Sequence, residues 1–394
     1  MQGPRAYLDH NATTPLHPAA RDAMCAALAR PGNASSVHAE GRAARAAIET
    51  ARIELGAFVG APAKAIVFTS GGTEALNLAL TPHLVVGAAK QPFERLLIGA
   101  GEHAAALAGH RFPADGVEIM PLTPQGVLDL EALESALARN AGRRVMLALQ
   151  AANNETGVIQ PVAAAARLAH AAGAVLVCDA VQAAGKTDCD IGRLEADALI
   201  VSGHKFGGPQ GVGALCFADP ASHIGETMIR GGGQERGARA GTENVAAIAG
   251  MAGALRAAGE RLELERKVLA ALRDGLESEI AHIAGDAVFF GSGVARLANT
   301  SCFGVPGIEA QLLLMFLDIE GVAVSSGSAC SSGKVKRSHV LTAMGVAPEL
   351  AGGAIRVSLG WDSSEEDCAL FVKALEKAVR TNKGRPRGAA FEAA

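Results

Sequence analysis

Short apolar runs alternate with stretches of helical periodicity along the first two thirds of the chain. The apolar runs, rich in Val, Ile and Leu, predict strands at residues 66–69, 96–98, 117–120, 145–149, 175–177, 198–201 and 213–217. Ala-rich or amphipathic stretches predict helices at residues 18–28, 75–80, 129–138 and 161–172. Strands and helices that alternate in this way predict an α/β fold, with a mostly parallel sheet covered by helices on both faces.

Polar residues follow several of these strands closely. In open α/β sheets the ligand crevice lies beyond the carboxyl ends of the strands. The polar residues that fall at this position are Thr73, His103, Asn154, Asp179 and Ser202. We therefore expect them to converge on one crevice.

Lys205 lies between a Ser-Gly-His sequence and a turn rich in Gly and Pro, within residues 201–213. A lysine that holds an aldehyde as a Schiff base must lose its proton near neutral pH, and such a lysine needs specialised surroundings. Enzymes that use pyridoxal 5'-phosphate (PLP) also place a partner, usually an acid, beside the pyridine nitrogen. Asp179, at the end of a buried strand, is a candidate for that acid. The alternative is an ordinary surface lysine.

Residues 66–80 read as a strand, a glycine turn and a helix. This arrangement directs free backbone N–H groups and the helix dipole at an anion. The alternative is that Thr73 caps the helix and no ligand binds there.

A second, smaller α+β domain is predicted after a long helical region at residues 245–281. We expect a large domain at residues 16–258 and a small domain built from residues 1–15 and 259–394. Strands of the small domain are predicted at residues 288–290, 300–303, 322–324 and 354–358, and helices at 308–320, 339–344 and 363–379. The glycine-rich stretch 231–244 is either a mobile surface loop or a loop held by a ligand or a partner chain.

Cys330 lies in a stretch dominated by Ser and Gly, at residues 325–333, which predicts a flexible and exposed loop. The cationic residues Lys334, Lys336 and Arg337 follow it and would favour the thiolate. An exposed nucleophile on such a loop suits sulfur transfer. In contrast, Cys178, Cys216 and Cys302 lie within apolar runs and are interpreted as packing residues.

The composition excludes several classes of protein. A formal net charge of −4 gives no sign of binding to nucleic acid or to an acidic membrane surface. Seven cysteines without paired spacing argue against a disulfide framework and a structural zinc site. The first residues lack the apolar core of a signal peptide, and no run approaches the roughly 20 apolar residues that cross a bilayer. We expect a cytoplasmic protein.

Several motifs together resemble those of the NifS/IscS-type cysteine desulfurases, which are PLP enzymes of the class V aminotransferase family. The two most specific are the sequences at 202–211 and 325–330. Further matching motifs lie at residues 7–14, 32–36, 69–74, 153–157, 179–185, 239–244 and 355–360. The resemblance covers nearly the whole chain, and it implies the PLP-dependent transferase fold of type I.

The resemblance also implies roles around the cofactor. Lys205 would bind the PLP aldehyde and act as the base at the substrate α-carbon. Asp179 would pair with the pyridine nitrogen, and His103 would stack on the ring and help to move protons. Asn154 and Gln182 would address the ring hydroxyl. The phosphate would be held by the residues of the two glycine-containing turns, namely Gly72, Thr73, Ser202, Gly203 and His204.

Three further roles concern the substrate and a second subunit. Arg356 and Asn33 would bind the substrate carboxylate, the arginine as a bidentate fork. Thr242 would reach the phosphate bound by the neighbouring subunit of a homodimer. Cys330 would attack the sulfur of L-cysteine and keep it as a persulfide, while L-alanine is released.

The acceptor of the sulfur is left open by the sequence. An iron–sulfur scaffold protein, a tRNA-thiolation relay and a nitrogenase-dedicated system all remain candidates. We expect no resident metal, although Cys330 could contact an iron–sulfur cluster transiently. Residues 336–337 are Lys and Arg where relatives often have an acidic residue and proline, which bears on the choice of acceptor.

Two alternative functions use the same residues. The first is an aminotransferase or selenocysteine lyase on the same scaffold, and a transaminase would not need Cys330. The second is a non-catalytic interaction protein that keeps PLP as a structural ligand. Release of alanine from cysteine would distinguish this last alternative from an enzyme.

Overall fold

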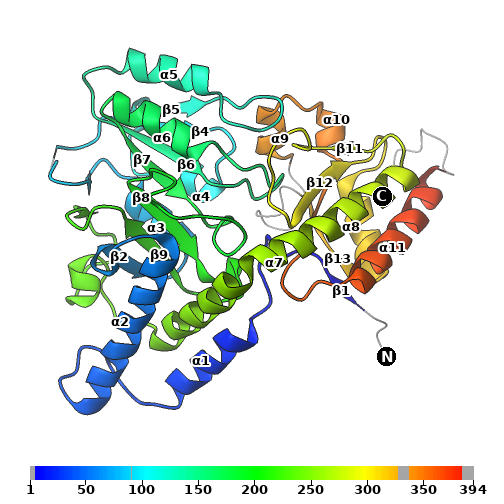
Figure 1. The fold of residues 1–394 in the computed structure, drawn as a ribbon. Coiled ribbons are helices and arrows are strands. Elements are labelled where there is room, and N and C mark those ends of the chain that lie inside the picture. Colours follow the sequence, from blue (N-terminus) through cyan, green and yellow to red (C-terminus); the bar gives the residue numbers. More distant parts are fainter. Residues whose placement is uncertain (1–4, 90, 327–336, 384–394) are drawn as a thin grey trace, which may run out of the picture.

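The computed structural model describes residues 5–89, 91–326 and 337–383, and it contains two principal sheets joined by one long helix (Figure 1). The larger sheet has seven strands in the order β2, β9, β8, β7, β6, β4 and β5. In that order they span Ile66–Thr69, Gly213–Phe217, Ala198–Ser202, Val175–Asp179, Val145–Gln150, Arg95–Gly99 and Val117–Met120. Neighbouring strands are parallel except where β9 pairs with β2 and β8. The predicted mostly parallel sheet is therefore confirmed.

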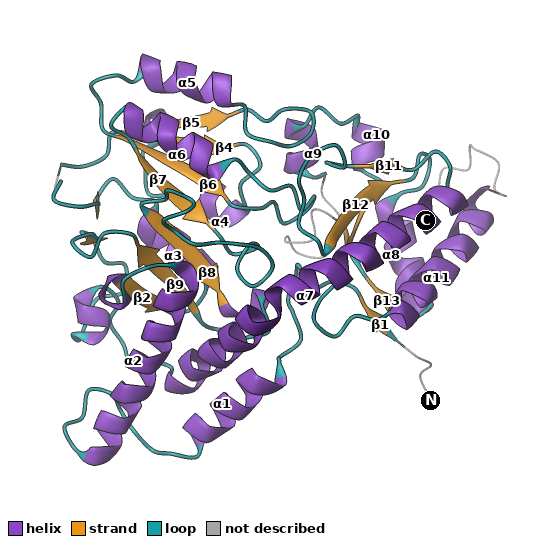
Figure 2. Cartoon of the chain, viewed as in Figure 1, coloured by secondary structure: helices purple, strands orange, loops and turns teal. Residues whose placement is uncertain are grey.

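Helices cover both faces of the larger sheet (Figure 2). Side chains alternate along a strand, so Leu147 and Leu149 of β6 enter one core while Met146 and Ala148 enter the other. The first face is covered by α1 (Pro18–Leu28), α2 (Ala39–Val59), α5 (Leu130–Arg139), α6 (Val162–Ala171) and the start of α7 (Val245–Ile283). The second face is covered by α3 (Gly72–Ala79) and α4 (Ala104–Leu107).

Helix α7 links the two halves of the molecule (Figure 1). The side-chain oxygen of Asn244 caps its start by accepting from Ala247 N at 3.1 Å. The first half of α7 buries Ile248 and Leu255 in the core of the larger sheet, and the second half buries Leu276 and Ile280 in a separate core. The predicted domain boundary at residue 258 falls within this helix, and the division into 16–258 and the remainder stays a prediction.

The second sheet is antiparallel and has the order β11, β12, β15 and β14. These strands span Val288–Phe289, Thr300–Gly304, Ala354–Ser358 and Ser325–Ser326, and the accompanying helices are α8 (Ala310–Ile319), α9 (His339–Ala343), α10 (Pro348–Ala351) and α11 (Glu365–Lys383). Near this sheet, β1 (Ala6–Tyr7) pairs in parallel with β13 (Val322–Ala323). A short pair of β3 (Leu84–Val85) and β10 (His223–Ile224) lies apart. Among the described residues, no helix combines the length and apolar character that a membrane span requires.

The first two residues of the flexible loop predicted for residues 325–333 belong to a strand. Ser325 and Ser326 form β14, pair with Arg356 and Ile355 of β15, and are 4% and 3% exposed. Their small side chains pack in the interior, and the Ser325 hydroxyl donates to the main-chain oxygen of Ser326. The prediction was wrong for these two residues because serine content alone does not reveal a strand partner 30 residues further along the chain. Cys330 lies outside the described residues.

The glycine-rich segment 231–244 is held by side chains of the same protein. Glu235 is buried and accepts two hydrogen bonds from Arg52 of α2, at 2.7 and 2.8 Å, and one from Phe68 N of β2 at 2.9 Å. Arg239 pairs with Glu74 at 3.0 Å. Glu235 and Arg236 have φ values of 47° and 56°, a backbone conformation that costs free energy unless surrounding contacts hold it. Neither sequence-based alternative for this segment anticipated these internal ion pairs.

The Arg52–Glu235 pair yields a test of stability. Replacing Glu235 with Gln takes away the buried carboxylate of the Arg52 guanidinium and leaves it only the more exposed Glu49, at 3.2 Å, among the ion pairs of the described residues. We expect the free energy of unfolding to fall by about 3–5 kcal/mol. Chemical denaturation measures this change. The control is Glu54→Gln, which breaks the more exposed pair of Glu54 with Arg256 and should cost less than about 1 kcal/mol. Equal effects of the two variants would contradict the anchoring role of Glu235.

Candidate active site

A cavity of about 420 Å³ lies at the carboxyl ends of the strands of the larger sheet. Its volume is within the range of small-molecule sites. The predicted residues that line it are Gly72, Thr73, His103, Asn154, Asp179, Gln182, Ser202, His204, Lys205 and Arg356. The sequence-based expectation that polar residues following the strands converge on one crevice is therefore met for Thr73, His103, Asn154, Asp179 and Ser202.

Three other predicted residues do not line this cavity, and a fourth is not described. Gly203 is buried in the turn between Ser202 and His204. Thr242 is exposed beside a separate cavity that Ser70 and Glu235 also line. Asn33 is exposed after α1, where its side-chain oxygen accepts from Ser35 N at 2.9 Å. Cys330 is outside the described residues, so the roles of these four stay predictions.

Lys205 ends a short turn, η3 (Gly203–Lys205), that follows β8 directly. Its amine donates to the main-chain oxygens of Asn11 at 2.6 Å and Ala12 at 2.8 Å. Thr14, which follows Asn11 and Ala12 in the N-terminal segment, also contacts Lys205. Its hydroxyl donates to the main-chain oxygen of Lys205 at 3.2 Å. The amine is thereby positioned by a segment almost 200 residues away in the sequence.

Asp179 is the last residue of β7 and lies beside Gln150 of β6 in the strand register. One oxygen of its carboxyl group accepts from Val181 N at 2.9 Å. Burial raises the pKa of Asp179 to about 6, against the opposing effects of the Val181 N–H and the charge of Lys205. A carboxyl group in this state is ready to pair with a cationic ligand nitrogen, which would stabilise its charged form.

His103 begins α4, and its Nδ1 accepts a hydrogen bond from Ala105 N at 3.0 Å. An imidazole that accepts at Nδ1 carries its proton at Nε2 when it is neutral. Burial lowers the pKa of His103, and the positive charges of Lys205 and His339 lower it further. The ring is therefore neutral near pH 7, with an N–H that it can exchange.

The start of α3 forms one corner of the cavity, and its N–H groups could hold an anion. Helix N-termini present N–H groups without intrahelical partners, and Gly72 and Thr73 place that end at the cavity. A Cβ atom at Gly72 would come within 2.8 Å of the Val181 side chain, so only glycine fits there. Ser202 and His204 complete the corner. Burial lowers the pKa of His204 to about 4, with Lys205 and Lys186 adding to the effect, so its ring is neutral near pH 7.

Arg356 enters the cavity from β15 of the second sheet. Its guanidinium donates to Asp9 Oδ1 at 2.7 Å and to the main-chain oxygen of Asn154 at 2.9 Å. The side chain is 4% exposed, and its buried Nε has no hydrogen-bond partner among the described residues. A fixed guanidinium that faces a cavity suits the carboxylate of a small substrate.

Sequence reasoning missed two buried acids close to the site. Glu102 accepts from Gln150 N at 2.8 Å, its second oxygen has no partner among the described residues, and burial next to Asp179 raises its pKa well above the usual range. Glu155 accepts from the Ser338 hydroxyl, and burial raises its pKa to about 7. Both acids follow apolar runs. That is a sequence signal for the sheet edge, but it did not distinguish a buried acid from a solvated one.

A profile described as aminotransferase class-V matches residues 6–371. The chain belongs to this family.

Similar proteins agree with this assignment. The chain is 42% identical over 369 residues to a cysteine desulfurase of Cereibacter sphaeroides, with 92% of each chain covered. It is 39% identical over 395 residues to an IscS-like cysteine desulfurase of Mycobacterium tuberculosis, with 99% of each covered. A solved structure of a NifS-like protein from Rickettsia africae has a TM-score of 0.86 at 32% identity and covers 96% of this chain and 100% of that one. The resemblance and the type I fold inferred from the sequence are confirmed.

Members of this class V family use PLP, and the chemistry of the cavity fits that cofactor. Lys205 offers the amine that an aldehyde requires, and Asp179 offers a buried carboxyl group for a ring nitrogen. The start of α3, with Ser202 and His204, offers donors for a phosphate. Within the described part of the chain, His, Cys, Asp and Glu side chains form no cluster of metal ligands.

Glu155 gives a prediction for the pH dependence of stability. Its usual pKa is 4.5 and its pKa in the fold is about 7, so between these values the folded protein holds a proton that the unfolded chain has lost. The stability of the wild type therefore falls as the pH rises from about 4.5 to about 7, by up to roughly 3 kcal/mol for this group.

The test is Glu155→Gln, which removes this titration and keeps an acceptor for Ser338. We expect the stability of the variant relative to the wild type to increase over that pH window and to level off above it. Melting temperatures of both proteins from pH 5 to 8 measure the difference. A difference that stays constant with pH would show that Glu155 is charged throughout.

Proposed function

We propose that this protein is a cysteine desulfurase, which uses PLP to take sulfur from L-cysteine and leaves L-alanine and a persulfide on Cys330. One observation carries the proposal. The cavity that contains Lys205, Asp179 and His103 is also lined by Ser325, five residues before Cys330. A residue that lines the proposed cofactor cavity and the cysteine that would supply the thiol are therefore near neighbours in the sequence.

Binding of the substrate is assigned to Arg356 and Asn33. The Arg356 guanidinium is held by Asp9 and Asn154, so it meets a carboxylate without losing side-chain freedom. This fixes one end of an amino acid and directs its α-carbon toward Lys205. PLP and the substrate share this cavity of about 420 Å³, which favours a small amino acid.

PLP, when bound, supplies an electron sink for the pair left at the substrate α-carbon when its proton is removed. Lys205 takes that proton at Nζ. The carbonyl groups of Asn11 and Ala12 already accept hydrogen bonds from this amine and would stabilise its protonated form. His103, neutral and protonated at Nε2, is a second group that can give or receive a proton within the cavity.

Sulfur transfer is assigned to Cys330. Its thiolate attacks the sulfur of the bound cysteine, so that an S–S bond forms as the C–S bond breaks. The electron pair of the broken bond stays with the three-carbon fragment, which takes up protons and leaves as alanine. The sulfur remains on Cys330 as a persulfide, from which an acceptor protein takes it.

The proposal extends to the assembly and its surroundings. We assign a homodimer in which Thr242 reaches the phosphate bound by the partner, a cytoplasmic location, and a sulfur-acceptor protein such as an iron–sulfur scaffold. The names of the relatives, which include IscS-like cysteine desulfurases, support a sulfur-donating role. An aminotransferase remains the alternative on the same fold.

The activity is tested by incubating the PLP-loaded protein with L-cysteine and measuring both alanine and protein-bound persulfide. We expect Lys205→Ala to abolish both products, because the α-proton is no longer removed. Cys330→Ala should retain PLP and lose the persulfide. The control is Cys25→Ala, which changes an exposed cysteine of α1 and should leave both products unchanged.

Two results would contradict the proposal. Normal persulfide formation by Cys330→Ala would remove this thiol from the reaction. Transfer of the amino group to an oxo acid at a rate that does not depend on Cys330, without release of sulfur, would instead establish an aminotransferase.

A further inference from the structure

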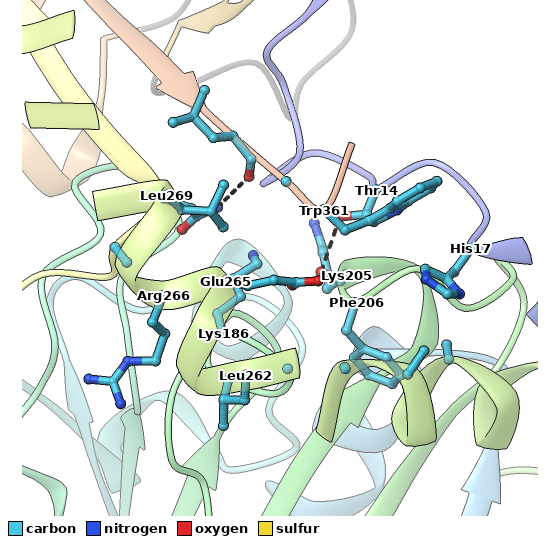
Figure 3. Close-up of a pocket in the computed structure, with 18 residues that line it drawn as sticks. Thr14, His17, Lys186, Lys205, Phe206, Leu262, Glu265, Arg266, Leu269 and Trp361 are labelled. Atoms are coloured by element: carbon cyan, nitrogen blue, oxygen red, sulfur yellow. Dashed lines mark hydrogen bonds between the residues drawn. The ribbon is translucent and has the colours of Figure 1, made fainter. Parts of the chain in front are cut away.

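Lys186 is a lysine behind the active-site cavity that has no role in the proposed reaction. It lies four residues after Gln182, and its amine donates to Gln182 Oε1 at 2.7 Å and to Asn11 Oδ1 at 3.1 Å. It also lines a small cavity of about 40 Å³ together with Lys205. Figure 3 shows both lysines at this cavity, between Trp361 and residues of α7.

Lys186 donates to the oxygen atoms of two side-chain amides, those of Gln182 and Asn11. An amine hydrogen requires an oxygen acceptor, so Gln182 and Asn11 must each direct their amide oxygen toward Lys186. The NH₂ group of Gln182 then points to the main-chain oxygen of Asn11, at 2.9 Å. The NH₂ group of Asn11 points to Thr300 Oγ1, also at 2.9 Å. Without the lysine, Gln182 Oε1 loses its donor at 2.7 Å and the side chain is held through its NH₂ group, whereas Asn11 Oδ1 keeps a donor in Asn299 Nδ2 at 3.1 Å.

The same network holds the amine of Lys205. The main-chain oxygen of Asn11 accepts from both Gln182 and Lys205, so a change at Asn11 reaches both cavity residues. Lys186 therefore contacts two residues that border the cavity, although it does not line the cavity itself. Lys186 thus contacts residues that would face PLP, and it would not contact PLP itself.

The surroundings of Lys186 are unfavourable for a cation, which argues that it is retained for more than stability. Burial lowers its pKa well below the usual range, and the charges of Lys205 and Arg356 lower it further. Its two acceptors are neutral amides rather than carboxylates. An apolar side chain of similar length would fill the same space without this desolvation cost.

We infer that Lys186 is a positioning residue that fixes the amide of Gln182 and the Asn11–Ala12 segment, so that Gln182 and Lys205 meet the cofactor in a single orientation. The inference rests on the proposed function, because it assigns PLP to the cavity. It names a residue that acts through Gln182 and Asn11 and does not touch the cofactor.

The test compares Lys186→Met with a matched control, Lys267→Met. Lys267 is an exposed lysine of α7 that lines a neighbouring cavity together with Lys186. The apoproteins are titrated with PLP, the visible absorbance gives the dissociation constant, and thermal melting of the apoproteins reports stability separately. We expect about tenfold weaker PLP binding for Lys186→Met, because Gln182 and Lys205 are then no longer held in one orientation before the cofactor binds, and no change for Lys267→Met.

A double-variant cycle shows whether the effect passes through Gln182. In a Gln182→Leu background, adding Lys186→Met should weaken PLP binding much less than it does in the wild type. Should Lys186→Met fail to fold, Lys186→Gln takes its place in the same cycle.

The outcomes distinguish failure of the role inferred for Lys186 from failure of the proposed function. If Lys186→Met lowers only the melting temperature and binds PLP as tightly as the wild type, Lys186 is merely structural and the inference is wrong. Additive losses in the cycle would contradict action through Gln182. If the wild type itself takes up no PLP, the proposed function fails before Lys186 is tested.

Discussion

The site depends on Asn11, a buried residue through which both halves of the molecule are bonded to one another. From the larger sheet, Lys205 and Gln182 donate to its main-chain oxygen. From the second sheet, Asn11 N donates to Ser358 and its side chain bonds to Thr300. The segment that carries Asn11 continues from β1, which pairs with β13 near the second sheet. The amine of Lys205 is therefore held by an N-terminal segment that is bonded to the second sheet as well.

Burial shifts the charges of the cavity in one consistent direction, toward neutrality. It raises the pKa of Asp179 to about 6 and lowers the pKa of His204 to about 4. Both changes have the same cause, because a low-dielectric site disfavours the charged form of any group. PLP carries a phosphate and a cationic ring nitrogen. It therefore brings charged groups into a cavity where burial shifts Asp179 and His204 toward their neutral forms. The protein thus provides geometry and donors, and much of the charge of the working site comes with the cofactor.

The sequence revealed the parts of the site that follow from local pattern. Asp179 and Ser202 end apolar runs, so their place at the sheet edge could be predicted from strand periodicity and from the rule that ligands bind beyond the strand ends. Asn11, Lys186 and Glu155 could not be found in this way. Their partners lie far along the chain or in another sheet, as for the contact between Glu155 and Ser338, and no periodicity encodes such a contact. The anchored loop around Glu235 was missed for the same reason.

The segment that contains Cys330 is bounded at both ends by residues held beside the cavity. On one side, Ser325 lines the cavity and pairs in register with Arg356. On the other, Ser338 donates to Glu155, and Nε2 of His339 lies 2.9 Å from the main-chain oxygen of Glu102. Both ends of this segment are therefore fixed by contacts at one cavity, the first through the second sheet and the second through two buried acids whose partners lie far away in the sequence.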